Sequence, residues 1–175
     1  ASGLFIEKSL REGIELRDAS QTDVEAAGTR LQALNDREQG EQVSPLRHEL
    51  QEIMQNHFGV FRTGEFMREG VAKLADLRER VENVSLADRS NAFNTSRIEC
   101  LELQNLFETA EATAVVAEAR DESRGAHARE DFTERDDERW LCHSIYHSEG
   151  KKVSKRSVNF TPQTVETFQP KARSY

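Results

Sequence analysis

The residues best suited by type and spacing to binding chemistry lie in the run 123–129, Ser-Arg-Gly-Ala-His-Ala-Arg. Arg124, His127 and Arg129 would place several donors in a small space if Gly125 turns the chain. Arginine binds a carboxylate through two parallel hydrogen bonds, so the cluster suits a dicarboxylate or an acidic residue of a partner. The alternative is local pairing with the acidic residues of segment 130–138, which is a common arrangement for neighbouring charges.

A metal site is the second kind of chemistry that the spacing suggests. Cys142, His143 and His147 lie close together, and two histidines four residues apart share a face when the segment is helical. No second cysteine pair or carboxylate motif completes a ligand set, and the segment has the pattern of a strand or loop. We therefore expect no metal, and we expect His143 to be an ordinary packed or hydrogen-bonded residue.

Motifs for cofactors and catalysis are missing from the sequence. The nine glycines form no G-x-G-x-x-G turn, and neither a P-loop nor a G-x-S-x-G elbow occurs. We expect no catalytic residue, no cofactor-binding residue and no bound flavin within these 175 residues.

Composition favours a helical domain. The chain is 36% hydrophobic and 32% charged, a balance typical of helices with one buried stripe and a wide solvated face. Its net charge of −8 makes nucleic acid an improbable partner, because phosphate binding needs a clustered basic surface. The apolar stretches are far shorter than the roughly 20 residues of a membrane span, and no signal peptide is visible, so we expect a soluble protein. Cys100 and Cys142 are widely separated, so we expect free thiols in a reducing compartment.

Periodicity predicts two helices before residue 43. The first runs from Leu4 to Leu16 and, since it lacks an N-cap and the chain lacks an initial Met, we expect it to continue a longer protein's helix. Processing of a precursor is the other explanation. The second helix begins at Ser20, with Asp23 in a capping-box-like position. Its expected buried side consists of Val24, Ala27, Leu31 and Leu34.

Three longer helices are predicted between residues 44 and 125. Ser44 and Pro45 suit an N-cap and a first helical residue, and Ser96 with Glu99 suits a capping box. Gly125 suits a left-handed C-terminus. The expected apolar stripes are Leu46, Leu50, Ile53, Met54, His57 and Phe61, then Met67, Val71, Leu74, Leu77, Val81 and Val84, then Ile98, Leu101, Leu106, Ala110, Ala114 and Ala117.

These elements predict an all-α fold, an antiparallel three-helix bundle similar to a spectrin repeat. Residues 1–43 form N-terminal helices, residues 44–125 the bundle, and residues 126–175 a charged loop and an irregular C-terminal arm with short strands. In the arm, the apolar residues Val153, Val158, Phe160, Val165 and Phe168 follow no helical period.

Several segments together resemble the succinate dehydrogenase flavoproteins, in order and over essentially the whole chain. They are residues 54–57 (M-Q-N-H) with 60–64, residues 101–106 (L-E-L-Q-N-L), residues 122–129 (E-S-R-G-A-H-A-R), residues 135–138 (R-D-D-E) with Trp140 and His143, and residues 171–175 (K-A-R-S-Y). The Arg-Asp-Asp-Glu version and the neighbourhood of Cys142 are similar to bacterial members. Fumarate reductase and L-aspartate oxidase share part of the Ser-Arg-Gly signature, but the residues around Leu101 and Trp140 favour succinate dehydrogenase.

The resemblance implies an enzyme that oxidises succinate to fumarate. In that family a covalently held FAD accepts hydride, an arginine takes the proton, and electrons pass to an iron–sulfur subunit. The groups that perform this chemistry precede the region that this chain resembles. The resemblance therefore implies a supporting domain whose partners are the flavin-binding domain of the same chain and the iron–sulfur subunit. The implied location is cytoplasmic, peripheral to the inner membrane through partner subunits.

The residues expected to make interdomain or subunit contacts are Arg124, His127, Arg129, Trp140 and His143. A different function class remains open: a freestanding helical-bundle module that binds a partner through its arm, since a fold does not fix a function. A reading frame that extends several hundred residues before Ala1 would favour the enzyme.

Overall fold

The computed structural model describes residues 2–15, 17–162, 165–168 and 171. The chain divides into two compact units, residues 1–38 and residues 39–175. The described part is mostly helical, with one two-stranded antiparallel sheet in the second unit. Within the described residues, no helix is both long and apolar enough to cross a membrane.

The first unit contains α1 (Ser2–Arg11) and α2 (Gln21–Asp36). The prediction of one helix from Leu4 to Leu16 was too long, and Leu16 itself lies outside the described residues. Gly13 adopts a φ of +70°, and the amides of Gly13 and Ile14 donate to the carbonyls of Leu10 and Ser9. Such a left-handed glycine satisfies the last carbonyls and ends the helix.

The N-cap of α2 is confirmed, whereas its predicted buried side is confirmed only at Leu34. Ser20 Oγ accepts a hydrogen bond from the amide of Asp23 at 3.4 Å. Leu34 is buried, but Val24 and Leu31 are exposed.

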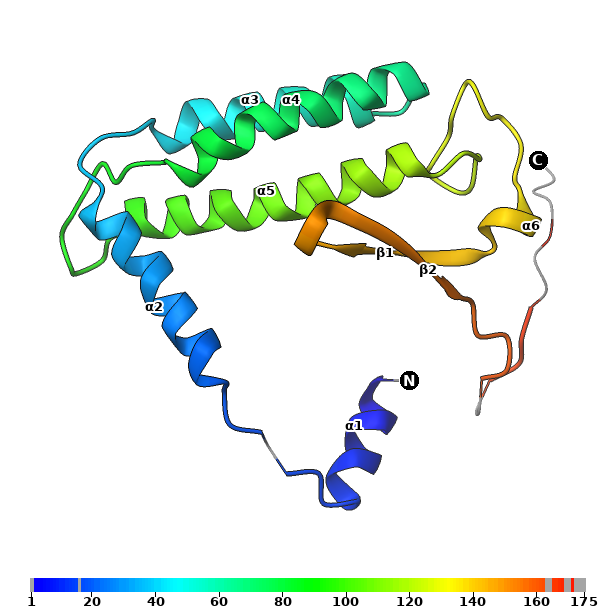
Figure 1. The fold of residues 1–175 in the computed structure, drawn as a ribbon. Coiled ribbons are helices and arrows are strands. Elements are labelled where there is room, and N and C mark those ends of the chain that lie inside the picture. The colour runs from blue at the N-terminus through cyan, green and yellow to red at the C-terminus, as the bar shows by residue number, and fades with distance from the viewer. Residues whose placement is uncertain (1, 16, 163–164, 169–170, 172–175) are drawn as a thin grey trace. The chain divides into compact units, whose positions relative to one another are not determined.

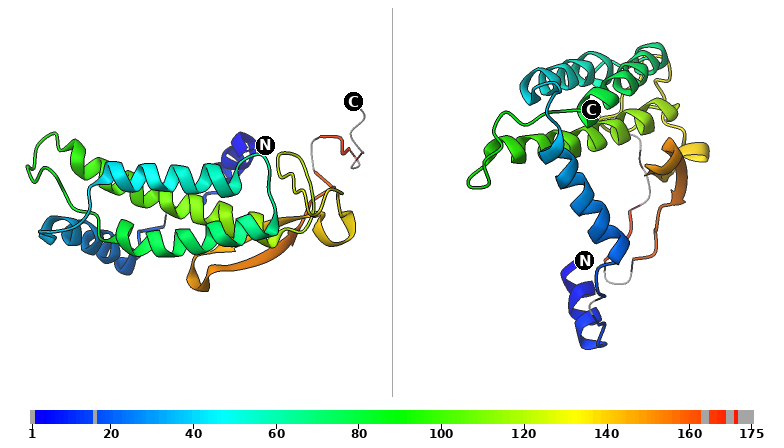
Figure 2. Two further views of the ribbon diagram at one scale, coloured as in Figure 1. Left: turned by 90° about the horizontal axis from the view of Figure 1, so that it is seen from above. Right: turned by 60° about the vertical axis from the view of Figure 1, so that its left-hand side comes forward.

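The second unit is built around α3 (Val43–Phe58), α4 (Gly64–Glu82) and α5 (Thr95–Ala119), which all contact one another. Figures 1 and 2 show these three helices side by side, with consecutive helices running in opposite directions. The helix starts differ from the predicted ones. α3 begins one residue earlier than Ser44, after Gln42, which makes no side-chain cap.

The start of α5 corrects a second predicted cap. Asn94, not Ser96, caps this helix, because its Oδ1 accepts from the amide of Arg97 at 2.7 Å. The Ser96 hydroxyl instead accepts from the amide of Ala87 at 3.0 Å, which ties the preceding loop to the helix.

The core of the second unit lies between these three helices. The α3 and α4 stripes are largely as predicted, although Phe61 is exposed beyond the end of α3. The first half of the α5 stripe was wrong: Ile98 and Leu106 are exposed, and Leu101 is only half-buried. The residues of α5 that are buried follow spacings of three and four, as a packed helix face requires. They are Cys100, Leu103, Phe107, Ala110, Glu111, Ala114 and Ala117.

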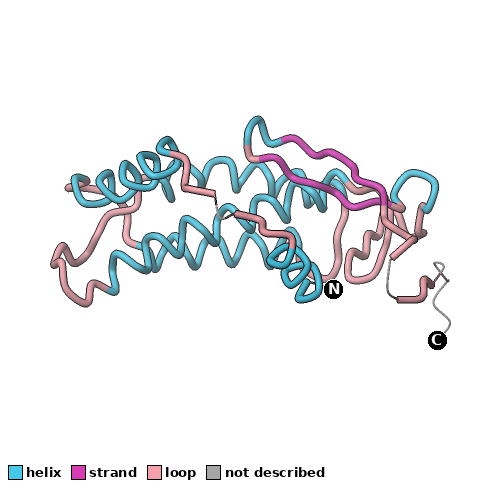
Figure 3. The backbone as a smooth tube through the Cα atoms, turned by 90° about the horizontal axis from the view of Figure 1, so that it is seen from below, coloured by secondary structure: helices cyan, strands magenta, loops and turns pink. Residues whose placement is uncertain are grey.

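The C-terminal arm contains the predicted short strands. A short helix, α6 (Asp137–Trp140), precedes β1 (Cys142–His147), a 3-10 turn η1 (Glu149–Lys151) and β2 (Lys152–Ser157). The strands pair antiparallel, from Cys142 opposite Ser157 to His147 opposite Lys152. Figure 3 shows the two strands as one hairpin, and both strands contact α5.

Candidate functional site

The loop that follows α5 holds most of the sequence-predicted residues. α5 ends at Ala119, so Gly125 does not end this helix as expected. Gly125 does have the expected positive φ of +62°, but within a tight turn between Arg124 and His127. The amide of Arg124 donates to the carbonyl of His127 at 2.7 Å, and the amide of His127 donates back at 3.1 Å.

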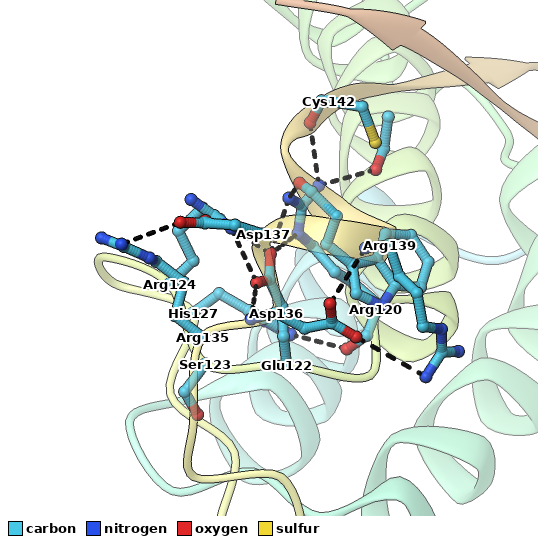
Figure 4. Close-up of polar contacts among 12 residues, drawn as sticks. Arg120, Glu122, Ser123, Arg124, His127, Arg135, Asp136, Asp137, Arg139 and Cys142 are labelled. Atoms are coloured by element: carbon cyan, nitrogen blue, oxygen red, sulfur yellow. Dashed lines mark hydrogen bonds and ion pairs between the residues drawn. The ribbon is translucent and has the colours of Figure 1, made fainter. Parts of the chain in front are cut away.

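Glu122 lies among Arg120, Arg124 and Asp136 in the close-up of Figure 4, and its side chain is fully buried. Its carboxylate accepts from Arg120 Nε at 2.7 Å, from Arg124 Nε at 2.8 Å and from the amide of Asp136 at 2.9 Å. Burial alone would raise the pKa of Glu122, but these donors outweigh it and the pKa lies below its ordinary value. A buried negative charge thus holds two arginines and the start of α6 together.

Arg124 pairs with two carboxylates through its Nε and Nη2. Besides Glu122, its Nη2 donates to Asp137 Oδ1 at 2.7 Å. These two carboxylates hold the pKa of the Arg124 guanidinium above its ordinary value. Arg124 thus makes a local charge pair with Asp137 of segment 130–138, as well as the pair with Glu122.

Arg129 is buried and likewise paired within the domain. Its Nε and Nη2 donate to the two oxygens of Asp131 at 2.8 and 2.7 Å, and its Nη1 lies 3.1 Å from Asp121 Oδ1. Asp131 also accepts from the amide of Gly64 at 2.8 Å, so this pair joins the loop to the start of α4. The bidentate hydrogen bond from Arg129 lowers the pKa of Asp131 strongly.

His127 is held in one neutral tautomer. Arg62 Nη1 donates to its Nδ1 at 2.9 Å, because a guanidinium can only donate. Nε2 therefore carries the proton, and it donates to the carbonyl of Arg120 at 3.1 Å. Burial and the neighbouring arginines lower the pKa of His127, which keeps the imidazole neutral.

Trp140 is joined to this loop through Arg120. It is buried, and Lys155 Nζ lies 3.5 Å from its ring centroid, while the Arg120 guanidinium lies 5.2 Å away. Arg120 also donates to the carbonyl of Trp140 and to Ser144 Oγ. These contacts attach the β-hairpin to the loop after α5.

His143 stands apart from the other four predicted residues. It is exposed on β1, opposite Arg156 on β2. The neighbouring His147 pairs its Nε2 with Ser154 Oγ at 2.7 Å. Across the ranges that the structure describes, no three His, Cys, Asp or Glu side chains come together in a way that could hold a metal ion.

The structure thus gathers Arg124, His127 and Arg129 around one loop and adds three residues that the sequence analysis did not select. Arg62, Arg120 and Glu122 supply as many contacts as the predicted residues do. Arg62 and Glu122 belong to two of the segments quoted above, whereas Arg120 carried no signal beyond its place at a helix end. The cluster has the chemistry of a fixed set of charges that positions a loop and a hairpin.

The chain matches a known protein family. Residues 47–175 match the family model described as fumarate reductase flavoprotein C-term. The succinate dehydrogenase flavoprotein subunit of Coxiella burnetii is 42% identical over 173 residues, which cover 99% of this chain and 29% of that protein. The mitochondrial succinate dehydrogenase flavoprotein subunit of rice is 47% identical over 136 residues, which cover 75% and 22%. The chain therefore spans less than a third of the length of these relatives.

Solved structures share the fold. A quinol fumarate reductase of E. coli matches with a TM-score of 0.73 and 34% identity, over 87% of this chain and 27% of that one. An Sdh1 complex of Mycobacterium smegmatis matches with a TM-score of 0.72 and 26% identity, over 95% and 28%. An adenylylsulfate reductase of Archaeoglobus fulgidus, at 20% identity and a TM-score of 0.72 over 92% and 28%, shares the fold alone.

Proposed function

Since the chain belongs to the succinate dehydrogenase and fumarate reductase flavoprotein family and corresponds to its C-terminal region, we propose that it is the C-terminal domain of a succinate dehydrogenase flavoprotein. The complete enzyme would oxidise succinate to fumarate through FAD and pass electrons to an iron–sulfur subunit. The observation that carries this proposal is the 42% identity to the Coxiella burnetii subunit over 99% of the chain. The flavin and the substrate groups would belong to the preceding domain.

The role of these residues in that enzyme is to support the flavin domain. Residues 44–125 would act as a three-helix bundle similar to a spectrin repeat, and residues 1–43 as helices that lead from the flavin domain. Pairwise contacts among α3, α4 and α5 support the first assignment. Residues 126–175 would form the arm that faces partners.

The turn from Arg124 to His127 is the proposed contact with the rest of the enzyme. Arg129 and Trp140 are buried in the domain, so their contribution would be to hold that turn and the hairpin in place. His143, exposed on β1, would be a separate contact point toward a partner subunit. Through such partners the enzyme would lie on the cytoplasmic side of the inner membrane.

The test compares the complete flavoprotein with the 175-residue chain. We expect flavin absorbance and succinate-dependent dye reduction from the complete flavoprotein, and neither from the separate chain. Flavin or turnover in the separate chain would contradict the assignment. A complete flavoprotein without succinate oxidation would contradict the proposed activity.

A further inference from the structure

An open groove of about 750 Å³ runs along the second half of α5. Ala112, Thr113 and Val116 of α5 line one side, and Ser144 and Tyr146 of β1 line another. Short side chains let a second polypeptide backbone approach closely, because little volume stands between it and the helix. The groove has the mixed apolar and hydroxyl lining that suits a peptide segment.

One end of the groove holds an arginine with an incomplete set of partners. Arg62 is half-buried, its Nε donates to the carbonyl of Gly59 at 2.8 Å, and its Nη1 donates to His127. Among the described residues, no carboxylate forms an ion pair with Arg62, and no acceptor forms a hydrogen bond with its Nη2. Burial lowers the pKa of Arg62, as expected for a charge with no anion to offset desolvation.

The backbone fixes Arg62 at this place. Its carbonyl accepts from the amide of Glu130 at 2.8 Å, and it forms an isolated parallel bridge with Arg129. A guanidinium held at its backbone, Nε and Nη1 loses little further freedom when Nη2 binds an oxygen. Arg124 and Arg129 are each paired with two carboxylates. Arg62 has no such pair among the described residues, so its guanidinium can still bind an acidic group.

We infer that this groove binds a segment of the flavoprotein sequence that precedes the domain, and that an Asp or Glu of that segment pairs with Arg62. The inference rests on the proposed function. The Coxiella burnetii relative has 71% of its length outside the matched region, since the chain covers 29% of it. A segment tethered in the same chain has a high effective concentration at the groove. A second copy is disfavoured, because two chains of net charge −8 repel each other.

The direct test uses the complete flavoprotein with Arg62→Lys and a carbodiimide, which joins an amine to a carboxylate only when the two are in contact. Peptide mapping should find the introduced amine linked to an Asp or Glu of the preceding sequence. The yield should exceed that of the exposed control Arg68→Lys by about tenfold or more, because docking holds the carboxylate in place. Arg62→Gln, which offers no amine, should give no such link.

A second measurement keeps the inference testable if the lysine is too short to react. Thr113→Cys places a thiol in the groove, and Asp76→Cys places one on the exposed side of α4. In the complete flavoprotein, maleimide should modify the groove thiol about tenfold more slowly, because the docked segment excludes reagent. Equal rates would overturn the inference, as would links from position 62 only to another subunit or to a second copy. Succinate oxidation by the same samples reports the proposed function separately.

Discussion

The phenol of Tyr146 donates a 2.8 Å hydrogen bond to Glu111 Oε2, and this contact joins the hairpin to the middle of α5. Glu111 is buried, and its carboxylate also forms ion pairs with Arg78 and Lys151. Burial would raise the pKa of Glu111, but its three donors outweigh burial and lower it. Burial and the same carboxylate raise the pKa of Tyr146 to about 12.

Removing this hydroxyl should weaken the attachment of the hairpin. Tyr146→Phe should lower the free energy of unfolding by about 1–2 kcal/mol, since a hydrogen bond to a charged, buried group is lost. Glu111→Gln should cost about 1–3 kcal/mol, because it removes the anion that Tyr146, Arg78 and Lys151 share, although Arg78 keeps its pair with Glu108. Urea unfolding measures both changes. A Tyr146→Phe variant as stable as the wild type would show that the contact does not hold the hairpin.

Gly70 lies where α4 packs tightly against α3. A Cβ there would lie 2.5 Å from His57 Cβ and 2.5 Å from Phe58 Cε2, and both belong to α3. Gly70→Ala should therefore destabilise the domain by about 1–3 kcal/mol, despite the higher helix propensity of alanine. Gly28→Ala, on α2 with no atom within 4 Å, is the matched control and should be neutral or stabilising by about 0.5–1 kcal/mol. Thermal unfolding that shows the same effect at both sites would contradict the close packing.

Two leucines of α5 test the corrected helix face. Leu103 is fully buried, whereas Leu106, three residues later, is 43% exposed. Leu103→Ala should cost about 2–5 kcal/mol from lost burial and the resulting cavity, and Leu106→Ala should cost less than about 1.5 kcal/mol. Denaturant midpoints in the reverse order would show that α5 packs through its other face.

The lowered pKa of His127 predicts that the free energy of unfolding depends on pH. Its lowered pKa means that the unfolded chain, with a histidine pKa near 6.5, binds more protons than the folded chain below that pH. The free energy of unfolding should therefore fall as the pH drops from about 6.5 toward the folded pKa of His127. Urea unfolding at two pH values in and above this window measures the slope. His127→Gln should flatten it. An unchanged slope in His127→Gln would show that His127 does not cause the pH dependence.

The sequence predicted the helices of the second unit well because their apolar residues repeat at helical spacing and their neighbours are polar. It predicted the α5 face less well. Leu101, Leu106 and Ile98 are as apolar as Leu103 and Phe107, so periodicity alone offered two overlapping faces, and tertiary packing selected one. The end of α1 was missed because the apolar pattern continues past Gly13, whose left-handed backbone stops the helix.

The sequence was enough to predict which residues the loop contains, but not which side chains pair with one another. The run 122–129 identified the loop, and the resemblance identified its family, which the comparisons confirm. Which partner meets which arginine depends on how the loop folds back, as in the pair of Arg129 with Asp121, and on contacts between distant segments, as in that of Arg62 with His127. No local pattern encodes those distances.

The most direct test of the central claim is reconstitution of the enzyme from two pieces. A flavoprotein that ends before this domain is expressed together with the separate 175-residue chain. If the chain is a supporting domain that docks on the flavin domain, the two pieces should co-purify in equal amounts and recover succinate oxidation that the shortened flavoprotein lacks. Full activity of the shortened flavoprotein alone, or a flavin-loaded shortened flavoprotein that does not bind the chain, would contradict this account.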